Sequence, residues 1–257
     1  MKVSVITICL NSAATIDDAI HSVASQDYRD IEYVIVDGGS TDGTREIINS
    51  RSDVVSRVVS EPDEGLYDAL NKGIRMSCGD VIALLHSDDI YADDRLITKV
   101  VEAFESSGAE AVYTDLEYVS RSNTTRTTRL WRAGIYSHGS FLNGWMPPHP
   151  ALFVKRAVYD RCGLYNTSFR ISADYEFMLR AIHKYGIDLH YLPITGVKMR
   201  VGGRSNISLG NRLLANREDR KAWRINGLHP HWYTTLLKPL SKIRQFRFGF
   251  GRKDKTA

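Results

Sequence analysis

Cysteine is scarce in this sequence, with three among 257 residues. Cys9, Cys78 and Cys162 lie far apart, are odd in number and show no metal-ligand spacing. This pattern excludes a disulfide framework and a zinc site built from closely spaced pairs. We therefore expect reduced thiols in a cytoplasmic protein.

Long apolar runs are also lacking. No run reaches the ~18 residues that a membrane-spanning helix needs. Met1 and Lys2 lead directly into an apolar stretch too short for a secretory signal, so we expect none. The formal net charge of +4 is mild, and no nucleic-acid-binding motif accompanies it, so we expect no nucleic-acid partner.

Two glycine-rich phosphate motifs are missing as well. The end of the first predicted strand, residues 10–13, contains no glycine. The glycine-containing segment 38–44 lacks the Gly-Lys-Ser/Thr of a P-loop and the Gly-x-Gly-x-x-Gly of a dinucleotide site. These absences argue against nucleoside triphosphate hydrolysis and against hydride transfer.

Strand and helix patterns alternate through Thr114, which predicts parallel βαβ units in an α/β fold. After Asp115 the pattern changes to hairpin material, a long loop rich in glycine and proline, and then mixed elements. The predicted strands of the part through Thr114 are 3–10, 31–36, 54–60, 81–85 and 109–114. Beyond it we expect a hairpin at 116–131 and a loop at 134–150, then helices at 154–159 and 175–184 and strands at 189–192 and 197–201. A basic helical region is expected from residue 211.

Acidic side chains follow three of the predicted parallel strands. Asp37 follows the second strand, Glu61 the third, and Asp88 and Asp89 the fourth, while Asn11 follows the first. Ligands of open α/β sheets bind outside the carboxyl ends of the strands. Acids there suit a divalent cation that shares its ligands with phosphate oxygens, which favours a nucleotide site. The alternative is that these residues only cap helices or form turns.

Four motifs in fixed order resemble family 2 of the inverting glycosyltransferases, which have the GT-A fold: residues 5–11, residues 36–44, residues 69–73, and His86-Ser87-Asp88-Asp89. The resemblance implies a mixed, mostly parallel sheet flanked by helices. It also implies a Rossmann-like nucleotide-sugar-binding half at 1–115, an acceptor-binding and catalytic half at 116–209, and a helical, basic extension at 210–257.

The resemblance assigns the donor side of the site. Asp37 corresponds to the acid that contacts the nucleotide base. Ser87-Asp88-Asp89 corresponds to the Asp-x-Asp-type motif, so we expect Mn²⁺ or Mg²⁺ chiefly on Asp89, with Asp88 toward ribose or phosphate. His149 is a second candidate metal ligand, with a partly buried structural histidine as the alternative. The expected nucleotide-sugar-binding residues are Thr7, Asn11, Asp37, Glu61, Lys72 and Asp88.

The resemblance also places a catalytic base in an acidic motif that opens a helix, here residues 172–176, and Asp174 is the matching acid. An attacking hydroxyl must lose its proton, and an aspartate within hydrogen-bond reach can accept it. Only one carboxylate is needed for this step, unlike the pair in glycoside hydrolases. The alternative is that Asp174 only stabilises the helix start.

Aromatic side chains mark the expected acceptor side. Trp145, in the loop that resembles the family's acceptor loop, offers a flat face to a sugar ring, and Tyr175 is the second acceptor candidate. Arg204 lies in the glycine-containing segment 202–205, which could close over the diphosphate of the donor.

The C-terminal tail alternates basic and aromatic residues from Lys238 to Lys255. Basic amphipathic stretches with aromatics bind membrane surfaces. A frayed terminus that packs its aromatics on the domain is the alternative. We expect a peripheral protein at the cytoplasmic face of the inner membrane, where a lipid-linked acceptor would be reached.

The sequence therefore predicts transfer of a hexose from a nucleotide diphosphate sugar, with UDP as the expected nucleotide, to a glycan hydroxyl. The expected acceptor is a glycan or polyprenyl-diphosphate-linked intermediate of O-antigen (lipopolysaccharide), capsule or exopolysaccharide synthesis. Two alternatives remain: a catalytically inactive sugar-nucleotide-binding protein, and a nucleotidyltransferase.

Overall fold

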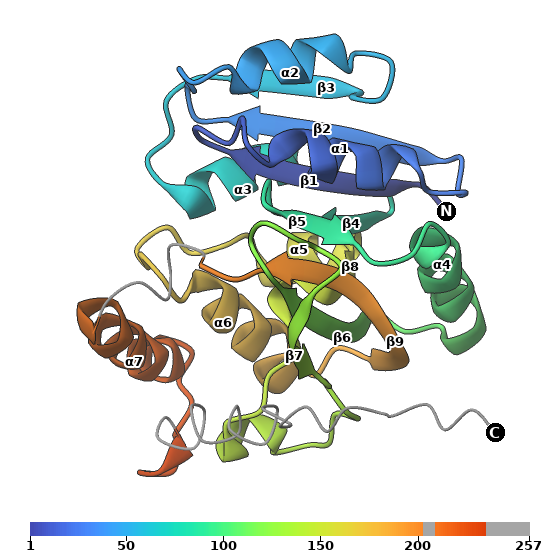
Figure 1. Ribbon diagram of the computed structural model, residues 1–257. Helices are drawn as coiled ribbons and strands as arrows, with labels where there is room; N and C mark the ends of the chain where they lie inside the picture. Colours follow the sequence, from blue (N-terminus) through green and yellow to red (C-terminus); the bar gives the residue numbers. More distant parts are fainter. Residues whose placement is uncertain (203–208, 235–257) are drawn as a thin grey trace, which may run out of the picture.

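The computed structural model describes residues 1–202 and 209–234, and within them a single mixed sheet forms the centre of the molecule (Figure 1). The strands run in the order β3-β2-β1-β4-β8-β6-β9-β5, and β7 pairs with β6 beside this path. They are β1 (Val3–Cys9), β2 (Ile31–Asp37), β3 (Arg57–Ser60), β4 (Val81–Leu84), β5 (Asp89–Tyr91), β6 (Ala111–Val119), β7 (Thr127–Trp131), β8 (Leu152–Lys155) and β9 (Leu189–Arg200).

The sequence pattern predicts helices over residues 45–50 and 66–76, and the structure has a helix at each place. Right-handed crossovers put α1 and α2 on one face of the sheet, and α3 on the other, because the chain reverses its direction across the sheet after β3. The α-helices are α1 (Ile16–Ala24), α2 (Thr44–Ser50), α3 (Leu66–Met76), α4 (Leu96–Ser107), α5 (Arg156–Cys162), α6 (Ala173–Met178) and α7 (Leu209–Ile225); the 3-10 turns are η1 (Ser140–Asn143) and η2 (His149–Ala151), and η3 (Leu179–Lys184) is a π-helical turn.

The expected parallel arrangement holds for the first four strands. β1 pairs in parallel with β2 and with β4, and β2 pairs in parallel with β3. Helix α3 approaches β1 closely because Gly73 has no side chain; an added Cβ there would collide with Ile6. The close approach brings the start of α3 to the edge where the strands end.

A strand in the middle of the sheet replaces part of a predicted helix. Residues 152–155 form β8, which lies between β4 and β6 and pairs antiparallel with both. The predicted helix at 154–159 is therefore wrong over its first two residues, and α5 begins at Arg156. Short apolar runs do not distinguish a buried strand from a buried helix by periodicity, which explains the error.

Three further strands differ from the prediction. β6 continues through Asp115 to Val119, across a register shift, so the sheet crosses the expected division at residue 115. The two strands expected at 189–192 and 197–201 form one strand, β9, parallel to β6. Asp89 begins β5, so Asp88 and Asp89 do not cap the following helix, which starts at Leu96.

Helix α7 lies beside α6 and contributes to the core (Figure 1). Its Trp223 is fully buried, and its indole Nε1 donates to the Tyr175 hydroxyl at 2.8 Å. Within residues 1–202 and 209–234 no helix combines the length and the hydropathy needed to cross a bilayer. The basic tail from Lys238 and the predicted diphosphate residue Arg204 lie outside the described residues.

Candidate active site

The carboxyl ends of β1, β2, β3 and β4 meet at one edge of the sheet because these strands are parallel. Asp37 is the last residue of β2, Glu61 follows β3, and His86 and Asp88 follow β4. The sequence therefore correctly predicts that these residues share an edge. Their side chains differ in burial, and that difference separates candidate ligands of a substrate from structural groups.

Two of the site's acids are partly accessible: Asp88 after β4, and Asp174 in the first turn of α6. His86 senses both. Burial lowers the pKa of His86 below its usual 6.5, while the charges of Asp88 and Asp174 oppose that shift. Because the charges of both carboxylates act on one imidazole, the end of β4 and the start of α6 belong to one site.

Asp174 is held by a tyrosine from the opposite half of the chain. The Tyr67 hydroxyl, in the first turn of α3, donates to Asp174 Oδ1 at 3.2 Å and to the carbonyl oxygen of Ile171 at 2.5 Å. Burial and the Asp174 charge raise the pKa of Tyr67, so it remains a protonated donor at neutral pH. The N-cap residue of α6 is Ser172, which makes no side-chain capping bond, so Asp174 is not the cap.

His149 lies against this group but is buried. Its Nε2 is 3.2 Å from the Tyr165 hydroxyl, and its ring centroid is 5.9 Å from that of His86. Burial lowers the pKa of His149 to about 4, against the charge of Asp174. His149 is therefore neutral at pH 7, and its exposed fraction of 7% fits the structural alternative better than a metal ligand.

Asp89 is placed differently from the expectation that it holds the metal. Its exposed fraction is 1%, and its Oδ1 accepts the Arg200 backbone N–H at 3.3 Å where β5 pairs with β9. Burial and the neighbouring Asp88 charge raise its pKa well above the usual range. Its second oxygen, Oδ2, is buried without a hydrogen-bond partner. A carboxyl group shielded in this way is less able than Asp88 to reach a bound ion, although the sequence assigns the ion chiefly to Asp89.

Asp37 is also fully buried, and its carboxylate is occupied by the protein. It accepts the Ser60 hydroxyl at 2.6 Å, the Ser40 hydroxyl, and the Ser40 N–H at 3.1 Å. Although burial would raise the pKa of Asp37, these bonds lower it. The carboxylate thus holds the turn after β2 in place, which disagrees with the predicted contact to a nucleotide base.

Thr7 is likewise buried inside β1, where its hydroxyl is paired with the Tyr33 hydroxyl at 3.0 Å. The predicted donor contact of Thr7 is therefore not supported. Asn11, by contrast, is exposed at the edge of the site, has a positive φ of 51°, and accepts the Thr41 N–H at 3.0 Å. It ties the loop after β1 to the loop after β2.

Lys72 forms a charged cluster at the same edge. Its Nζ lies 2.9 Å from Asp63, 3.0 Å from Glu61 and 3.3 Å from Asp68. The hydrogen bonds that Lys72 donates to Asp63 and Glu61 raise the pKa of this lysine. Asp63 lies against the β2 turn, since a Cβ added to Gly38 would be 3.0 Å from its Oδ2. The predicted donor residues Lys72 and Glu61 thus pair with each other.

The two predicted acceptor aromatics have different surroundings. Trp145 is half-buried in a cluster with Tyr113, Tyr136 and Phe141, and its Nε1 donates to the Ala133 carbonyl at 2.7 Å. Tyr175 is only 3% exposed and faces α7, away from any acceptor. The structure therefore disagrees with the prediction that Tyr175 contacts the acceptor.

Sequence reasoning missed Tyr67, His86 and Asp63. His86 was visible as the first residue of the motif that ends in Asp88 and Asp89, where its spacing from Asp88 is that of an Asp-x-Asp pair. Tyr67 carries no such signal, because its partner Asp174 is 107 residues away.

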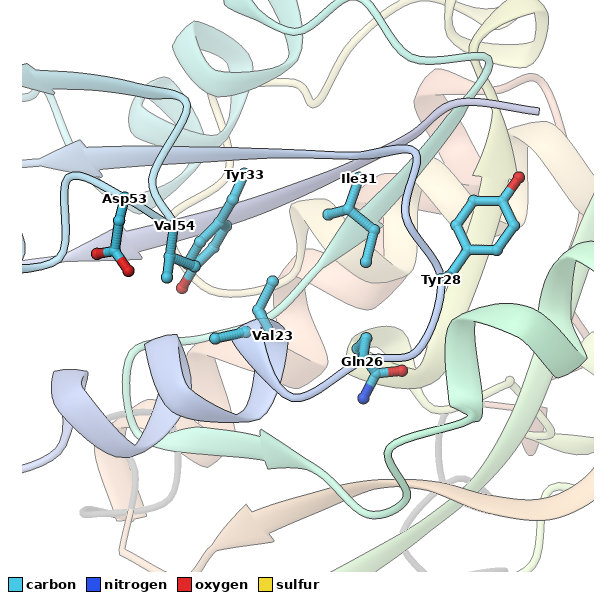
Figure 2. A pocket seen from close by; sticks show the side chains of 8 residues that line it. Val23, Gln26, Tyr28, Ile31, Tyr33, Asp53 and Val54 are labelled. Carbon is cyan, nitrogen blue, oxygen red and sulfur yellow. The ribbon is translucent and has the colours of Figure 1, made fainter.

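A small cavity of about 210 Å³ lies elsewhere, between the end of α1 and the start of β2 (Figure 2). Val23, Ile31, Tyr33 and Val54 line it, with Asp53 at one side. It is at the amino end of β2, whereas Asp37 is at the carboxyl end. The cavity is therefore separate from the candidate site.

Whether these residues can hold a metal ion depends on how many of its ligands the protein must supply. Among the described residues no group of three or more His, Cys, Asp or Glu side chains is arranged to hold an ion. Mg²⁺-type ions in nucleotide sites commonly use one or two carboxylates, with the remaining ligands from phosphates and water. The partly accessible Asp88 fits that mode.

Comparisons with known proteins find similar sequences and similar folds. The family model described as glycosyl transferase family 2 matches residues 4–167. An uncharacterized glycosyltransferase of Mycobacterium tuberculosis is 34% identical over 70% of this chain and 68% of its own length. A glycosyltransferase of Mycobacterium bovis, named for PGL/p-HBAD biosynthesis, is 30% identical over 82% of each chain.

Solved structures share the fold at low sequence identity. S. aureus TarS 1–349 in complex with UDP-GlcNAc has a TM-score of 0.68 at 15% identity, covering 88% of this chain. The match spans 65% of that chain, slightly less than two thirds of it. The mannosyltransferase PcManGT from Pyrobaculum calidifontis, in complex with GDP-Man and Mn²⁺, has a TM-score of 0.64 at 19% identity over 94% of this chain and 69% of its own.

Proposed function

The chain belongs to glycosyl transferase family 2 and has the GT-A fold; from this premise we propose that it transfers a hexose from UDP-hexose to a glycan hydroxyl with inversion. The observations that support the proposal are that Asp88 and Asp174 are both partly accessible, that the charges of both act on His86, and that Tyr67 at the start of α3 binds Asp174 at 3.2 Å. One carboxylate serves the leaving group and the other serves the attacking hydroxyl.

Asp174 is the proposed general base. An acceptor hydroxyl attacks the anomeric carbon, the new C–O bond forms as the bond to the diphosphate oxygen breaks, and the hydroxyl proton passes to the Asp174 carboxylate. The Tyr67 hydroxyl fixes Oδ1 at 3.2 Å, which orients the carboxylate for that transfer. Attack from the side opposite the diphosphate inverts the anomeric configuration.

Asp88 is the proposed carboxylate on the donor side, in place of Asp89, because only Asp88 is accessible. A bound Mn²⁺ or Mg²⁺ would neutralise the charge that develops on the departing diphosphate. Asp88 would hold it together with the donor's own phosphates. The lowered pKa of His86 favours its neutral form beside Asp88.

Nucleotide recognition is proposed for the loops after β1 and β2, where Asn11 is exposed. We propose that residues 1–115 bind the nucleotide sugar and residues 116–209 the acceptor, although β6 continues across the boundary. We further propose a polyprenyl-diphosphate-linked glycan acceptor of surface-polysaccharide synthesis. The basic residues of 210–257 would hold the enzyme at the anionic cytoplasmic face of a membrane.

A thermal-stabilisation screen of nucleotide sugars, with and without Mn²⁺, tests the donor proposal because a bound ligand raises the melting temperature by mass action. We expect a metal-dependent rise with a UDP-hexose. Asp174→Asn should keep that rise and lower transfer by ~10²- to 10⁴-fold, the usual share of a general base. Asp160→Asn, an exposed acid on α5, is the matched control.

The same experiment separates the two alternatives. An inactive binding protein would show the thermal rise without transfer in the wild-type chain. A nucleotidyltransferase would release inorganic pyrophosphate from a nucleoside triphosphate and a sugar phosphate. Transfer that survives Asp174→Asn would contradict the base assignment.

A further inference from the structure

Glu218 is a buried carboxylate on α7 that the proposed chemistry does not use. Its exposed fraction is 7%, and it accepts three backbone N–H groups of the segment before α6. Oε1 accepts Arg170 at 2.8 Å; Oε2 accepts Ile171 at 2.9 Å and Ser172 at 2.8 Å. We propose that Glu218 is a positioning residue for Asp174, an inference that rests on the proposed role of Asp174 as base.

The position of these amides gives Glu218 its effect. They belong to the three residues directly ahead of α6; Ser172 is the N-cap, whose N–H has no partner within the helix, and Arg170 and Ile171 form the chain that leads into it. The N-cap residue Ser172 does not cap the helix with its own side chain; its hydroxyl donates to the Ala215 carbonyl of α7 at 3.4 Å. The carboxylate of Glu218 therefore takes the place of a side-chain cap at the start of α6, in addition to the acids of the first turn, Asp174 and Glu176.

Residues 170–172 are also held from the side of α3, by Tyr67. While Glu218 accepts the N–H of Ile171, the Tyr67 hydroxyl donates to the carbonyl of the same residue at 2.5 Å. Ile171 is thus fixed between α7 and α3, and Asp174 follows it by three positions. A shift of Ile171 would move the Asp174 carboxylate relative to both Tyr67 and His86.

The residues that flank Asp174 are tied to α7 as well. Trp223 Nε1 donates to the Tyr175 hydroxyl at 2.8 Å, and Asn226 Nδ2 donates to Glu176 Oε1 at 3.0 Å. Both contacts are on the α7 side of α6, whereas Asp174 points to α3. Helix α7, which lies beyond the segment that matches the family model, is therefore part of the catalytic unit.

Glu218→Gln removes the charge but keeps the shape; its N–H₂ group replaces one carboxylate oxygen and cannot accept, so at least one of the three backbone N–H groups loses its acceptor. Since a displacement of about 1 Å can cost ~10²-fold in rate, we expect kcat to fall ~10- to 100-fold. The KM for the donor should change less than about twofold, because the donor side is untouched. Arg217→Gln, the exposed neighbour on α7, should leave kcat and KM unchanged.

A variant that only destabilises the fold would also lower the measured kcat, because part of the enzyme would be unfolded. Val100→Ala, in the fully buried face of α4 far along the sheet, supplies a control with reduced melting temperature but an intact Asp174 segment. We expect Glu218→Gln to lower kcat well beyond Val100→Ala at equal melting temperature. Equal effects of the two variants would overturn the proposal.

The decisive comparison combines Glu218→Gln with Asp174→Asn. If Glu218 acts through Asp174, adding Glu218→Gln to Asp174→Asn should lower the residual rate less than about threefold, since interacting residues are not additive. If Glu218→Gln lowers the rate by the same factor in the wild-type enzyme and in Asp174→Asn, Glu218 does not act through Asp174, and the proposal is wrong.

Hydrogen exchange on the substrate-free protein gives a measurement that needs no activity. Exchange at residues 170–172 should speed at least about tenfold in Glu218→Gln and remain unchanged in Arg217→Gln. Faster exchange without a fall in kcat would overturn the positioning role alone. Absence of transfer by the wild-type enzyme with every nucleotide sugar would instead overturn the proposed function and leave the exchange result intact.

Discussion

The hydroxyl of Tyr67 donates a hydrogen bond to the carboxylate of Asp174 at 3.2 Å, across 107 positions of chain. This bond joins the start of α3, in the half that carries the strand-end acids, to the start of α6. It therefore places the Asp174 carboxylate against the half of the chain that carries the strand-end acids.

Replacing Tyr67 by Phe tests that relationship. The variant leaves Asp174 without its donor and removes a bond from the Ile171 carbonyl, so we expect kcat to fall about tenfold and stability to fall by about 1 kcal/mol. The donor KM should be unchanged. Steady-state kinetics and chemical unfolding measure both effects.

The control for this variant is Tyr33→Phe, which removes a buried hydroxyl paired with Thr7. It should cost similar stability without a change in kcat. A normal kcat in Tyr67→Phe would show that Asp174 needs no help from Tyr67.

Replacement by asparagine should affect metal-dependent donor binding at Asp88 but not at Asp89. Asp88→Asn removes the accessible carboxylate, so we expect the Mn²⁺-dependent part of the donor-induced melting shift to disappear. Asp89→Asn replaces a buried acid, and the amide oxygen can still accept the Arg200 N–H. Its donor binding should stay within about threefold of wild type.

The melting shift with UDP and Mn²⁺, measured for both variants, decides between the two residues. Loss of the metal effect in Asp89→Asn with retention in Asp88→Asn would restore the sequence-based assignment of the metal to Asp89.

Asp37 should matter more for stability than for donor contact. Asp37→Asn places an amide N–H₂ against the donor groups of Ser40 and Ser60, which we expect to cost about 1–3 kcal/mol of unfolding free energy. The measurement is urea-induced unfolding, with Asp42→Asn, on the exposed part of the same turn, as the comparison. A stable Asp37→Asn protein that no longer binds donor would instead support a base contact.

Stability should fall as pH falls from 7 toward 4, because His149 is buried and neutral. Its pKa is lowered to about 4 in the folded protein, so the unfolded chain takes up a proton near pH 6.5 while the folded chain does not. Between pH 7 and pH 5 this group alone should lower the unfolding free energy by about 2 kcal/mol. The lowered pKa of His86 acts in the same direction.

Unfolding experiments at pH 7 and pH 5 check this dependence. His149→Asn should remove about 2 kcal/mol of the difference between the two pH values. His21→Asn, an exposed histidine of α1, is the control. An unchanged pH dependence in His149→Asn would show that His149 titrates normally in the folded protein.

Local patterns were sufficient for much of the first half. Helix α3 begins and ends where its apolar spacing predicts, at Leu66 and Met76, and the parallel strands bring the residues after β2, β3 and β4 to one edge. These features depend on periodicity and chain direction, which are properties of neighbouring residues. β8 was missed because a four-residue apolar run carries no distinguishing period.

By itself, the sequence determined the fold class, the edge at which the acids gather, and the motif order that identifies the family. Only the tertiary structure decided which acids are usable. Asp88 and Asp89 are chemically identical neighbours, yet the pairing of β5 with β9 buries one of them and leaves the other accessible. Burial, and the long-range partners Tyr67 and Glu218 that hold the Asp174 segment, arise from elements that are distant in the chain, so no local pattern encodes them.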